Sequence, residues 1–250
     1  MHPVLFKIGT IKIYSYGVFV FGGVVAGYLV FSYFLKKERF DKKIIQDLFF
    51  YMIIGGFVGA RILYILINLD YFFASPLKTL FGRSGFVFYG GILGGILSLF
   101  LYSSKNRLCV WKVLDVCSVS ILIGHSIGRI GCFMNGCCFG IPNPRWGIEF
   151  SPQSFAGMFY PHQKIIPTQL ISSISLFIFF LIFIYLYRHR KFEGQIFCLY
   201  LVVYGVFRFL IEFLRGDPRP FIGGLSLFQW MSLGLILAGT SLYILKSFKK

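Results

Sequence analysis

Apolar residues are concentrated in seven long runs, which are separated by shorter connections rich in charged residues, glycine or proline. Each run holds about 20 residues, the length that an α-helix needs to cross the ~30 Å hydrocarbon core of a bilayer. The runs cover residues 13–35, 48–69, 85–103, 110–130, 168–187, 196–214 and 225–245. The pattern predicts an all-α, polytopic membrane protein, in which residues 1–250 form a single domain that crosses the bilayer seven times.

The connections between the runs carry the basic residues unevenly. Fourteen lysines and arginines fall in the connections on one side of the predicted bilayer, including the segment KKERFDKK at 36–43, and seven fall on the other side. Basic loops resist translocation, so the richer side is expected to be cytoplasmic. We therefore expect the N-terminus outside, the C-terminus in the cytoplasm, and the long connection 131–167 outside.

The composition agrees with a membrane location and argues against two other classes of protein. Apolar residues make up 57% of the chain and charged residues 14%, whereas soluble domains contain about 45–50% and about 25%. The net charge of +16 would favour a nucleic-acid partner in a soluble protein, but these bases lie in short clusters beside apolar runs, where lipid headgroups attract them. No nucleic-acid partner is expected.

The first run is longer than the apolar part of a signal peptide, so we expect it to remain as an anchor.

Four arginines lie within or at the ends of predicted spans, where an unpaired guanidinium is costly. They are Arg61, Arg129, Arg208 and Arg215. Arg208, Glu212 and Arg215 are spaced i, i+4 and i+7, so a continuous helix would place them on one face. Two interpretations stay open. In the first, the three residues form a structural ion-pair ladder. In the second, two arginines around one acid leave a positive charge that binds an anion.

Glycine is frequent, with 28 residues, and many glycines are spaced four apart as in close helix–helix contacts. The pairs are Gly23/Gly27, Gly55/Gly59, Gly90/Gly94, Gly91/Gly95 and Gly124/Gly128. Packing alone explains the first two pairs. In the segments 88–95 and 128–140, glycines stand among polar residues, as they do where backbone approaches a ligand. A broken or re-entrant segment there would have to line a cavity.

Three of the six cysteines, Cys132, Cys137 and Cys138, follow His125 in the segment GHSIGRIGCFMNGCCFG. The spacing argues against a zinc site, because adjacent cysteines lack the two-residue gap of zinc knuckles and no second pair follows. We interpret them as small packing residues near a site and expect no metal or other cofactor. Metal binding and a redox role of the thiols remain the alternatives. For His125, a purely structural role as a buried hydrogen-bonding residue is the alternative to a role in the site.

The end of the fourth predicted span carries a series of residues that resembles a family signature. In order, these residues are Gly128, Arg129, Gly131, Phe133, Asn135 and Gly140. They are similar to the signature of the bacterial prolipoprotein diacylglyceryl transferases. Further matches follow the family order along almost the whole chain: Tyr16-Gly17, GARILY at 59–64, YGGILGG at 89–95, PTQL at 167–170, YGVFRFLIEFLRGD at 204–217 and the step from Gly224 to Gln229.

This resemblance implies an enzyme of the bacterial cytoplasmic (inner) membrane. Such an enzyme moves the diacylglyceryl group of phosphatidylglycerol onto the lipobox cysteine thiol of a preprolipoprotein signal peptide, forming a thioether and releasing glycerol phosphate. Membrane lipids and the signal peptide are then the expected partners. The resemblance assigns Arg129, Arg208 and Arg215 to the site, with Glu212 as their acidic companion. Residues expected around the lipid are Tyr16, Arg61, Gly90, Gly91, Gly128, Gly131, Asn135, Gly140 and Gln169.

The chain departs from the family where the acceptor thiol would be activated. Family members commonly carry histidine where this chain has Tyr89, asparagine and glutamate where it has Cys132 and Cys137, and an acid where it has Ser172. A phenol with a pKa of ~10 is poorly matched to a thiol of pKa ~8.5. The positive field of the arginines, or His125 on the Arg129 face, is the expected substitute.

Two alternatives to this transferase remain. One is a diverged relative that uses another acceptor or has lost activity. The other is a transporter or binder of anionic amphiphiles that uses the same arginines without chemistry. Transporters of this size usually contain internal repeats, and none is visible in the sequence.

Overall fold

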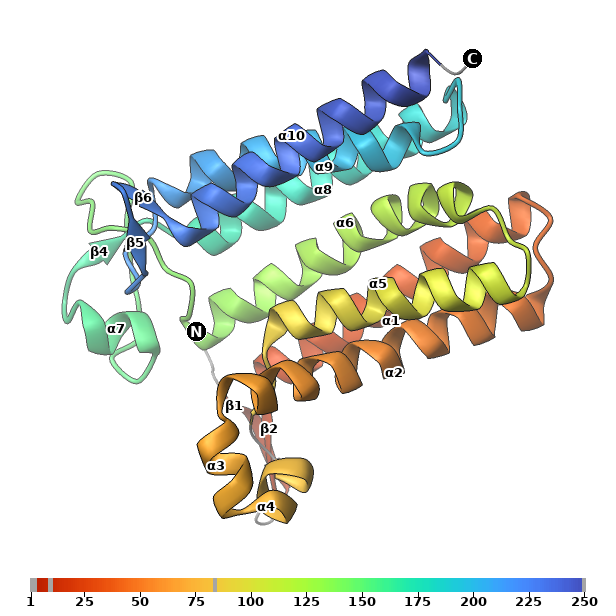
Figure 1. Ribbon diagram of the computed structural model, residues 1–250. Helices are drawn as coiled ribbons and strands as arrows, with labels where there is room; N and C mark the ends of the chain where they lie inside the picture. Colours follow the sequence, from red (N-terminus) through yellow and green to blue (C-terminus); the bar gives the residue numbers. More distant parts are fainter. Residues whose placement is uncertain (1–3, 9–10, 83–84, 249–250) are drawn as a thin grey trace. The chain divides into compact units, whose positions relative to one another are not determined.

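The computed structural model describes residues 4–8, 11–82 and 85–248 and is mostly helical (Figure 1). Its long helices are α1 (Ser15–Lys37), α2 (Lys42–Ile67), α5 (Phe88–Lys105), α6 (Val110–Asn135), α8 (Thr168–Arg188), α9 (Gln195–Glu212) and α10 (Leu227–Ser247). Six of them, all except α5, are long and apolar enough to cross a membrane. The chain is therefore a multi-pass membrane protein, and the seventh crossing, by the 18-residue α5, stays a prediction.

Several helices begin or end away from the predicted boundaries. Helix α2 begins at Lys42 rather than at residue 48, because long basic side chains can reach the headgroup region from a helix end. Helix α6 continues beyond residue 130 to Asn135. Short strands also occur, as three two-stranded antiparallel sheets: β1 (Val4–Ile8) with β2 (Ile11–Tyr14), β3 (Ile148–Glu149) with β4 (Lys164–Ile165), and β5 (Phe221–Ile222) with β6 (Leu225–Ser226). These strands are short, so the structure remains mostly helical, as the sequence predicted.

The chain divides into two compact units, and the predicted single domain stays a prediction. Unit 1 combines Met1–Phe31 with Leu114–Lys250, and unit 2 is Ser32–Val113. Each unit is described by itself.

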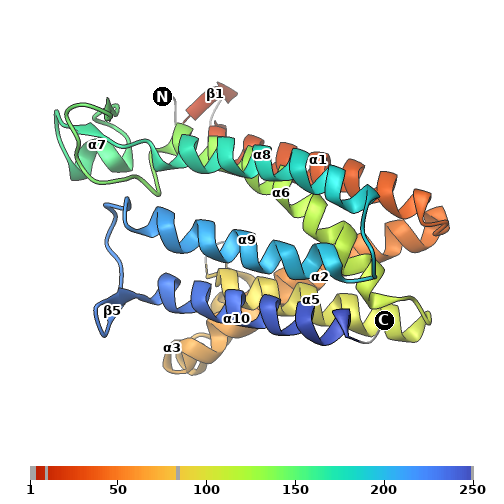
Figure 2. The same ribbon diagram turned by 90° about the horizontal axis from the view of Figure 1, so that it is seen from above.

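In unit 2, α2 and α5 run side by side (Figure 2), and the short helices α3 (Leu69–Ala74) and α4 (Pro76–Phe81) connect them. Glycines bring the two helices together. A Cβ built on Gly55 would lie 2.7 Å from the Gly94 carbonyl oxygen, and one on Gly59 would lie 2.8 Å from the Cα of Gly94. The segment 88–95 is part of the continuous helix α5, so the backbone is not broken there, and close packing accounts for its glycines.

In unit 1, α9 and α10 form an antiparallel pair, visible in both views (Figures 1 and 2). Asp115 of α6 has no exposed surface and accepts hydrogen bonds from the backbone N–H groups of Gly194 and Phe197, at 2.8 and 2.9 Å. It therefore fixes the first turn of α9 and satisfies two of the N–H groups that every helix start leaves free. Helices α6 and α8 are joined by Ser126 Oγ, which lies 2.8 Å from the Ser173 carbonyl oxygen.

The connection between α6 and α8 forms a small lobe with a core of its own. It contains β3, β4 and the short helix α7 (Phe155–Phe159). Its buried core consists of Phe139, Phe150, Ala156 and Ile165. The lobe joins the end of α6 to the start of α8, the two helix ends that carry the signature segment and the Pro-Thr-Gln-Leu step (Figure 1).

Candidate active site

Glu212, the last residue of α9, is the centre of a buried charge cluster in unit 1. Its carboxylate is paired with Arg208 one turn earlier, and it also accepts a hydrogen bond from Ser226 Oγ at 2.9 Å. Arg219 Nη1 lies 3.4 Å from the same carboxylate. Only 3% of the Glu212 side chain and 12% of the Arg208 side chain are exposed. The predicted arrangement of two arginines around one acid is present, but the second arginine is Arg219.

Arg215 does not continue the helical face that the sequence predicted. Helix α9 ends at Glu212, so Arg215 lies in the following segment and pairs with Asp217 instead. The pair is bidentate, with Nε and Nη2 each 2.8 Å from a carboxylate oxygen. Burial acts to raise the pKa of Asp217, but the pairs with Arg215 and Arg219 outweigh it and hold this pKa below its usual value. Arg215 also forms a β-bridge with Gly140, which joins the signature segment to the end of α9.

Residues at the start of α10 contact the charge cluster and help to hold it in place. Ser226 and Gln229 form a capping box, in which the side chain of each residue hydrogen-bonds to the backbone N–H of the other. The guanidinium groups of Arg208 and Arg219 lie 4.9 and 4.3 Å from the ring centroid of Phe228. The aromatic face stabilises both cations and limits their positions.

Arg129 has a different environment from the paired arginines. Its Nε donates a hydrogen bond to His125 Nε2 at 3.0 Å, so the predicted shared face of these two residues is confirmed. Within residues 4–8, 11–82 and 85–248, no carboxylate lies within ion-pair distance of Arg129. Arg129 and Arg208 both act electrostatically on His125. The positive charge of Arg129 is available to an anion.

The glycines of the signature segment have different surroundings. A Cβ on Gly131 would lie 2.9 Å from the Phe19 Cβ and 3.3 Å from the Tyr16 carbonyl oxygen, so this glycine allows α1 to approach α6. Gly140 is similarly enclosed, since its Cβ would lie 2.6 Å from the Ile166 carbonyl oxygen. Gly128 has nothing within 4 Å of such a Cβ. Only Gly128 leaves open space beside the neighbouring Arg129.

The turn after α6 is held by the first turn of α8. Gln169 Nε2 donates to the Cys137 carbonyl oxygen and Thr168 Oγ1 to the Cys138 carbonyl oxygen, both at 2.8 Å. Gln169 has no exposed surface, and its Oε1 has no hydrogen-bond partner among the described residues. Asn135 interacts with the Cys137 thiol through its side chain. Gln169 is thus brought to the signature segment, which contains Asn135.

The three signature cysteines meet in this turn. Their sulfur atoms all lie within 4.8 Å of one another, and Cys137 Sγ is 3.7 Å from the Cys132 carbonyl oxygen. Hydrogen bonds from the Cys132 and Cys137 thiols lower the pKa of Cys138, burial opposes this effect, and the charges of Arg215 and Arg129 lower that pKa further. The sequence spacing did not indicate this convergence.

In unit 2, Arg61 is engaged with backbone. Its Nε, Nη1 and Nη2 donate to the carbonyl oxygens of Leu80, Gly85 and Gly82 at 3.1, 3.0 and 2.9 Å. The guanidinium also lies 5.0 Å from the Phe86 ring centroid. Arg61 therefore anchors the chain between α4 and α5. Its expected lipid contact stays a prediction.

The other predicted unit 2 residues lie at the start of α5. Tyr89 is in its first turn. Gly90 faces α2, since a Cβ there would lie 2.6 Å from the Leu63 Cβ, and Gly91 would place one 3.4 Å from the Gly56 carbonyl oxygen. Packing accounts for both glycines, and a role as lipid contacts is not needed to explain them.

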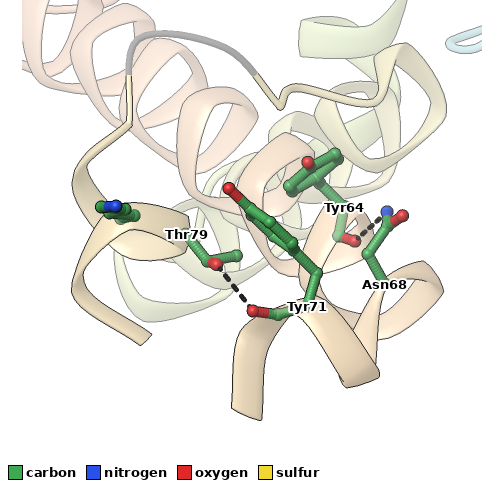
Figure 3. Close-up of a pocket in the computed structure, with 5 residues that line it drawn as sticks. Tyr64, Asn68, Tyr71 and Thr79 are labelled. Carbon is green, nitrogen blue, oxygen red and sulfur yellow. Dashed lines mark hydrogen bonds between the residues drawn. The ribbon is translucent and has the colours of Figure 1, made fainter. Parts of the chain in front are cut away.

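A half-open pocket of about 260 Å³ lies nearby in unit 2, lined by Tyr64, Asn68, Tyr71, Lys78 and Thr79 (Figure 3). Asn68 Nδ2 donates to the Tyr64 carbonyl oxygen at 2.9 Å, and Thr79 Oγ1 lies 3.5 Å from the Tyr71 carbonyl oxygen. The pocket walls are therefore fixed by local backbone contacts, and the residues that line it are not signature residues.

Three contributors to the unit 1 cluster were missed from the sequence: Asp217, Arg219 and Ser226. The signal for Asp217 and Arg219 was present in the alternating charges of RGDPRP at 215–220, and Ser226 lies within the step from Gly224 to Gln229. With them, the described site holds the guanidinium groups of Arg129, Arg208, Arg215 and Arg219 and the carboxylates of Glu212 and Asp217. Four positive charges face two negative ones, so the arrangement suits a phosphate ester.

Comparisons with known proteins agree over almost the whole length. A family model described as prolipoprotein diacylglyceryl transferase matches residues 3–245. The phosphatidylglycerol-prolipoprotein diacylglyceryl transferase of Clostridium tetani is 38% identical, over 100% of both chains. Its namesake from Campylobacter hominis is 35% identical over 97% of this chain and 90% of its own, and transferase 2 from Clostridium perfringens is 33% identical over 100% and 97%.

Proposed function

Since the chain belongs to the prolipoprotein diacylglyceryl transferase family, we propose that it alkylates the lipobox cysteine of a preprolipoprotein signal peptide. Diacylglyceryl transfer is its activity, and phosphatidylglycerol and prolipoprotein are its substrates. In the proposed reaction, the acceptor sulfur attacks the glyceryl carbon that bears the phosphate. A C–S bond forms, the C–O bond breaks, glycerol phosphate leaves with the bonding electrons, and the thiol proton passes to a base.

The observation that carries the proposed site is the unpaired positive charge of Arg129. A phosphodiester that becomes a phosphate monoester gains negative charge as the C–O bond breaks. Guanidinium groups placed beforehand at that position stabilise the transition state more than the ground state. Arg129 and Arg208 are proposed to hold the phosphate, with Arg215 and Arg219 adding to the field.

Glu212 is proposed as a positioning residue. It holds Arg208 in place through their ion pair, while Ser226 fixes the carboxylate. Glu212→Gln would keep the hydrogen bond from Ser226 but weaken the pair with Arg208. Partial loss of transfer is the expected result.

The remaining predicted residues are proposed to contact the lipid or the acceptor. Tyr16, Asn135, Gln169 and the open side of Gly128 lie around the signature segment of unit 1 and would contact the glycerol headgroup. The lipid-facing roles of Arg61, Gly90, Gly91, Gly131 and Gly140 are retained as proposals, although packing or backbone contacts already account for their positions.

Two side chains are candidates for the base that takes the thiol proton, and each has a drawback. His125 Nε2 accepts the hydrogen bond from Arg129, so its lone pair is engaged and the ring proton belongs on Nδ1. Tyr89 is a phenol, whose ordinary pKa of ~10 makes it almost fully protonated near neutral pH. Neither side chain is a ready base.

The proposed location is the bacterial cytoplasmic (inner) membrane, with seven crossings, the N-terminus outside and the C-terminus in the cytoplasm. The excess of basic residues on one side supports this orientation. Epitope tags inserted at 104–107 and 188–193 should be reached by antibody only after the cytoplasmic membrane is permeabilised. A tag in 131–167 should be reached while the cytoplasmic membrane is intact, once the outer layers of the cell envelope have been opened. The opposite labelling at any of these places would refute the orientation.

The activity test uses the purified full chain in lipid nanodiscs with a synthetic lipobox peptide. With phosphatidylglycerol present, mass spectrometry should show a peptide heavier by one diacylglyceryl group, together with free glycerol phosphate. A peptide with serine in place of the acceptor cysteine is the matched control and should remain unmodified. Unchanged peptide and intact phosphatidylglycerol in well-folded preparations would refute the proposal and favour a binder or transporter.

A further inference from the structure

The turn after α6 gathers three thiols that the proposed chemistry does not use. Cys132 is in the last turn of α6, and Cys137 and Cys138 follow it. Gly136 and Cys138 adopt left-handed backbone conformations, with φ of +73° and +64°. The thiols at positions i, i+5 and i+6 converge in this turn.

The distances between the sulfur atoms suit a shared ligand. All three lie within 4.8 Å of one another. Thiolates bound to one tetrahedral zinc ion at ~2.3 Å have sulfur atoms about 3.8 Å apart. A disulfide requires a sulfur–sulfur distance of ~2.05 Å and would use only two of the three. Small side-chain movements are enough to place all three sulfurs around one ion.

The surroundings favour a site with negatively charged ligands. Three thiolates around a divalent cation carry a net charge of −1. Arg215 and Arg129 both act electrostatically on the Cys138 thiol, so cations are present to offset that charge. The turn itself is held by hydrogen bonds from Thr168 and Gln169 to its carbonyl groups, so the ligands are supported from a second helix.

We propose that Cys132, Cys137 and Cys138 bind one thiophilic divalent cation of the Zn²⁺ class, and that its fourth coordination position takes the acceptor cysteine of the prolipoprotein. This inference rests on the proposed function. Catalytic zinc sites have three protein ligands and one open position, and a coordinated thiol is deprotonated outright. The cation would therefore activate the acceptor thiol, for which Tyr89 and His125 are poorly suited.

The step balances without an oxidant or reductant. On binding the cation, the acceptor thiol releases its proton to solvent. The metal-bound thiolate then attacks the glyceryl carbon, so that a C–S bond forms and the C–O bond to phosphate breaks, and glycerol phosphate leaves with the electron pair. The thioether product is a weaker ligand than a thiolate and can leave the cation.

The first test measures metal binding without turnover. Purified full-length protein is kept reduced and loaded with Zn²⁺, and a weak chelator is then used to remove loosely bound Zn²⁺. The protein should retain about one Zn²⁺ per chain. The Co²⁺-loaded protein should show thiolate-to-cobalt charge-transfer absorption. Cys138→Ser should weaken that absorption, and Cys109→Ser, which leaves the three-cysteine cluster intact, should not.

The second test asks what occupies the fourth position. In nanodiscs without phosphatidylglycerol, a lipobox peptide should increase the charge-transfer absorption of the Co²⁺ protein, whereas the same peptide with serine should not. Equal spectra with the two peptides would overturn the role of the fourth position. Two results would overturn the site itself. One is the absence of stoichiometric Zn²⁺ binding. The other is a disulfide, in protein isolated without reductant, that leaves only one of the three thiols open to alkylation.

The third test links the cation to turnover and separates this inference from the proposed function. A strong chelator should reduce transfer by at least about tenfold, and added Zn²⁺ should restore it, while size-exclusion profiles stay unchanged. Full transfer by metal-free protein would overturn the inference and leave the transferase intact. Absence of transfer under every condition would instead count against the proposed function, and the binding and spectral tests would still decide the metal site.

Discussion

Replacing Arg129 by lysine separates phosphate recognition from a structural role. The substitution keeps one positive charge but removes the planar fork of N–H donors that can hold two phosphate oxygens at once. In the folded protein, Arg129 donates a hydrogen bond to His125 Nε2, and no carboxylate among the described residues pairs with it. The two roles therefore differ in the size of their effects.

The structural loss should be small and the catalytic loss large. Losing one hydrogen bond from a charged donor costs about 1.5–3 kcal/mol at most, and lysine recovers part of it by approaching His125 as a single donor. Losing one preorganised donor to the developing phosphate charge costs about 2.7–4 kcal/mol, or roughly a 100- to 1000-fold lower rate. Arg129→Lys should thus accumulate near the parental level and transfer very slowly.

The assay compares protein level with transfer in the same membranes, using the lipobox peptide and quantitative mass spectrometry. Arg145→Lys is the matched control, because Arg145 is exposed in the lobe between α6 and α8, and both its protein level and its transfer rate should equal those of the parent. Near-parental turnover by Arg129→Lys, or a turnover loss that only follows lost protein, would refute phosphate binding by the fork and return Arg129 to a packing role.

Three further substitutions test the packing and the charges around the site. Arg61→Lys should lower the thermal unfolding temperature in detergent, because Arg61 donates to three backbone carbonyl groups; an unchanged unfolding temperature would contradict this. Gly59→Ala should destabilise the protein by about 1–3 kcal/mol, because its Cβ meets the backbone of α5, whereas Gly22→Ala, with open space at its Cβ, should not, and equal unfolding temperatures for the two variants would count against the glycine contact. Asp217 has a lowered pKa, so its contribution to stability is complete above the unfolded value of about 3.9 and is lost as the pH falls through the lower folded value; the unfolding temperature of the parent should therefore fall more steeply below about pH 4 than that of Asp217→Asn, and parallel curves would show that its pair with Arg215 adds no stability.

The membrane class and most of the helices follow from the sequence alone. Apolar runs of about 20 residues require a bilayer-spanning helix, because backbone groups must be satisfied within the segment when no water is present. Helix ends were less well predicted, since hydropathy marks only the apolar part of a helix, and α6 continues to Asn135. The family was also visible in the sequence, through the signature around Arg129 and the segment that contains Arg208 and Glu212.

Tertiary structure decided which charged side chains meet. Helical spacing predicted Arg215 on the face of Glu212, but α9 ends at Glu212, and the following segment returns Arg219 and Ser226 to that carboxylate instead. Spacing along a chain specifies neighbours only while the helix continues. Beyond its last residue, the path of the backbone decides which residues come together.

The same limit applies to the glycines and the cysteines. Four-residue glycine spacing was visible at 88–95, but only the approach of α2 shows that these glycines pack against a helix rather than break one. The spacing of Cys132, Cys137 and Cys138 does not show that their thiols meet, and only the turn with two left-handed residues shows that they do. Sequence therefore determined the properties that depend on local hydropathy and helical period. Contacts made across turns and between helices depend on backbone dihedral angles and on packing, which the periodicity of a single chain does not contain.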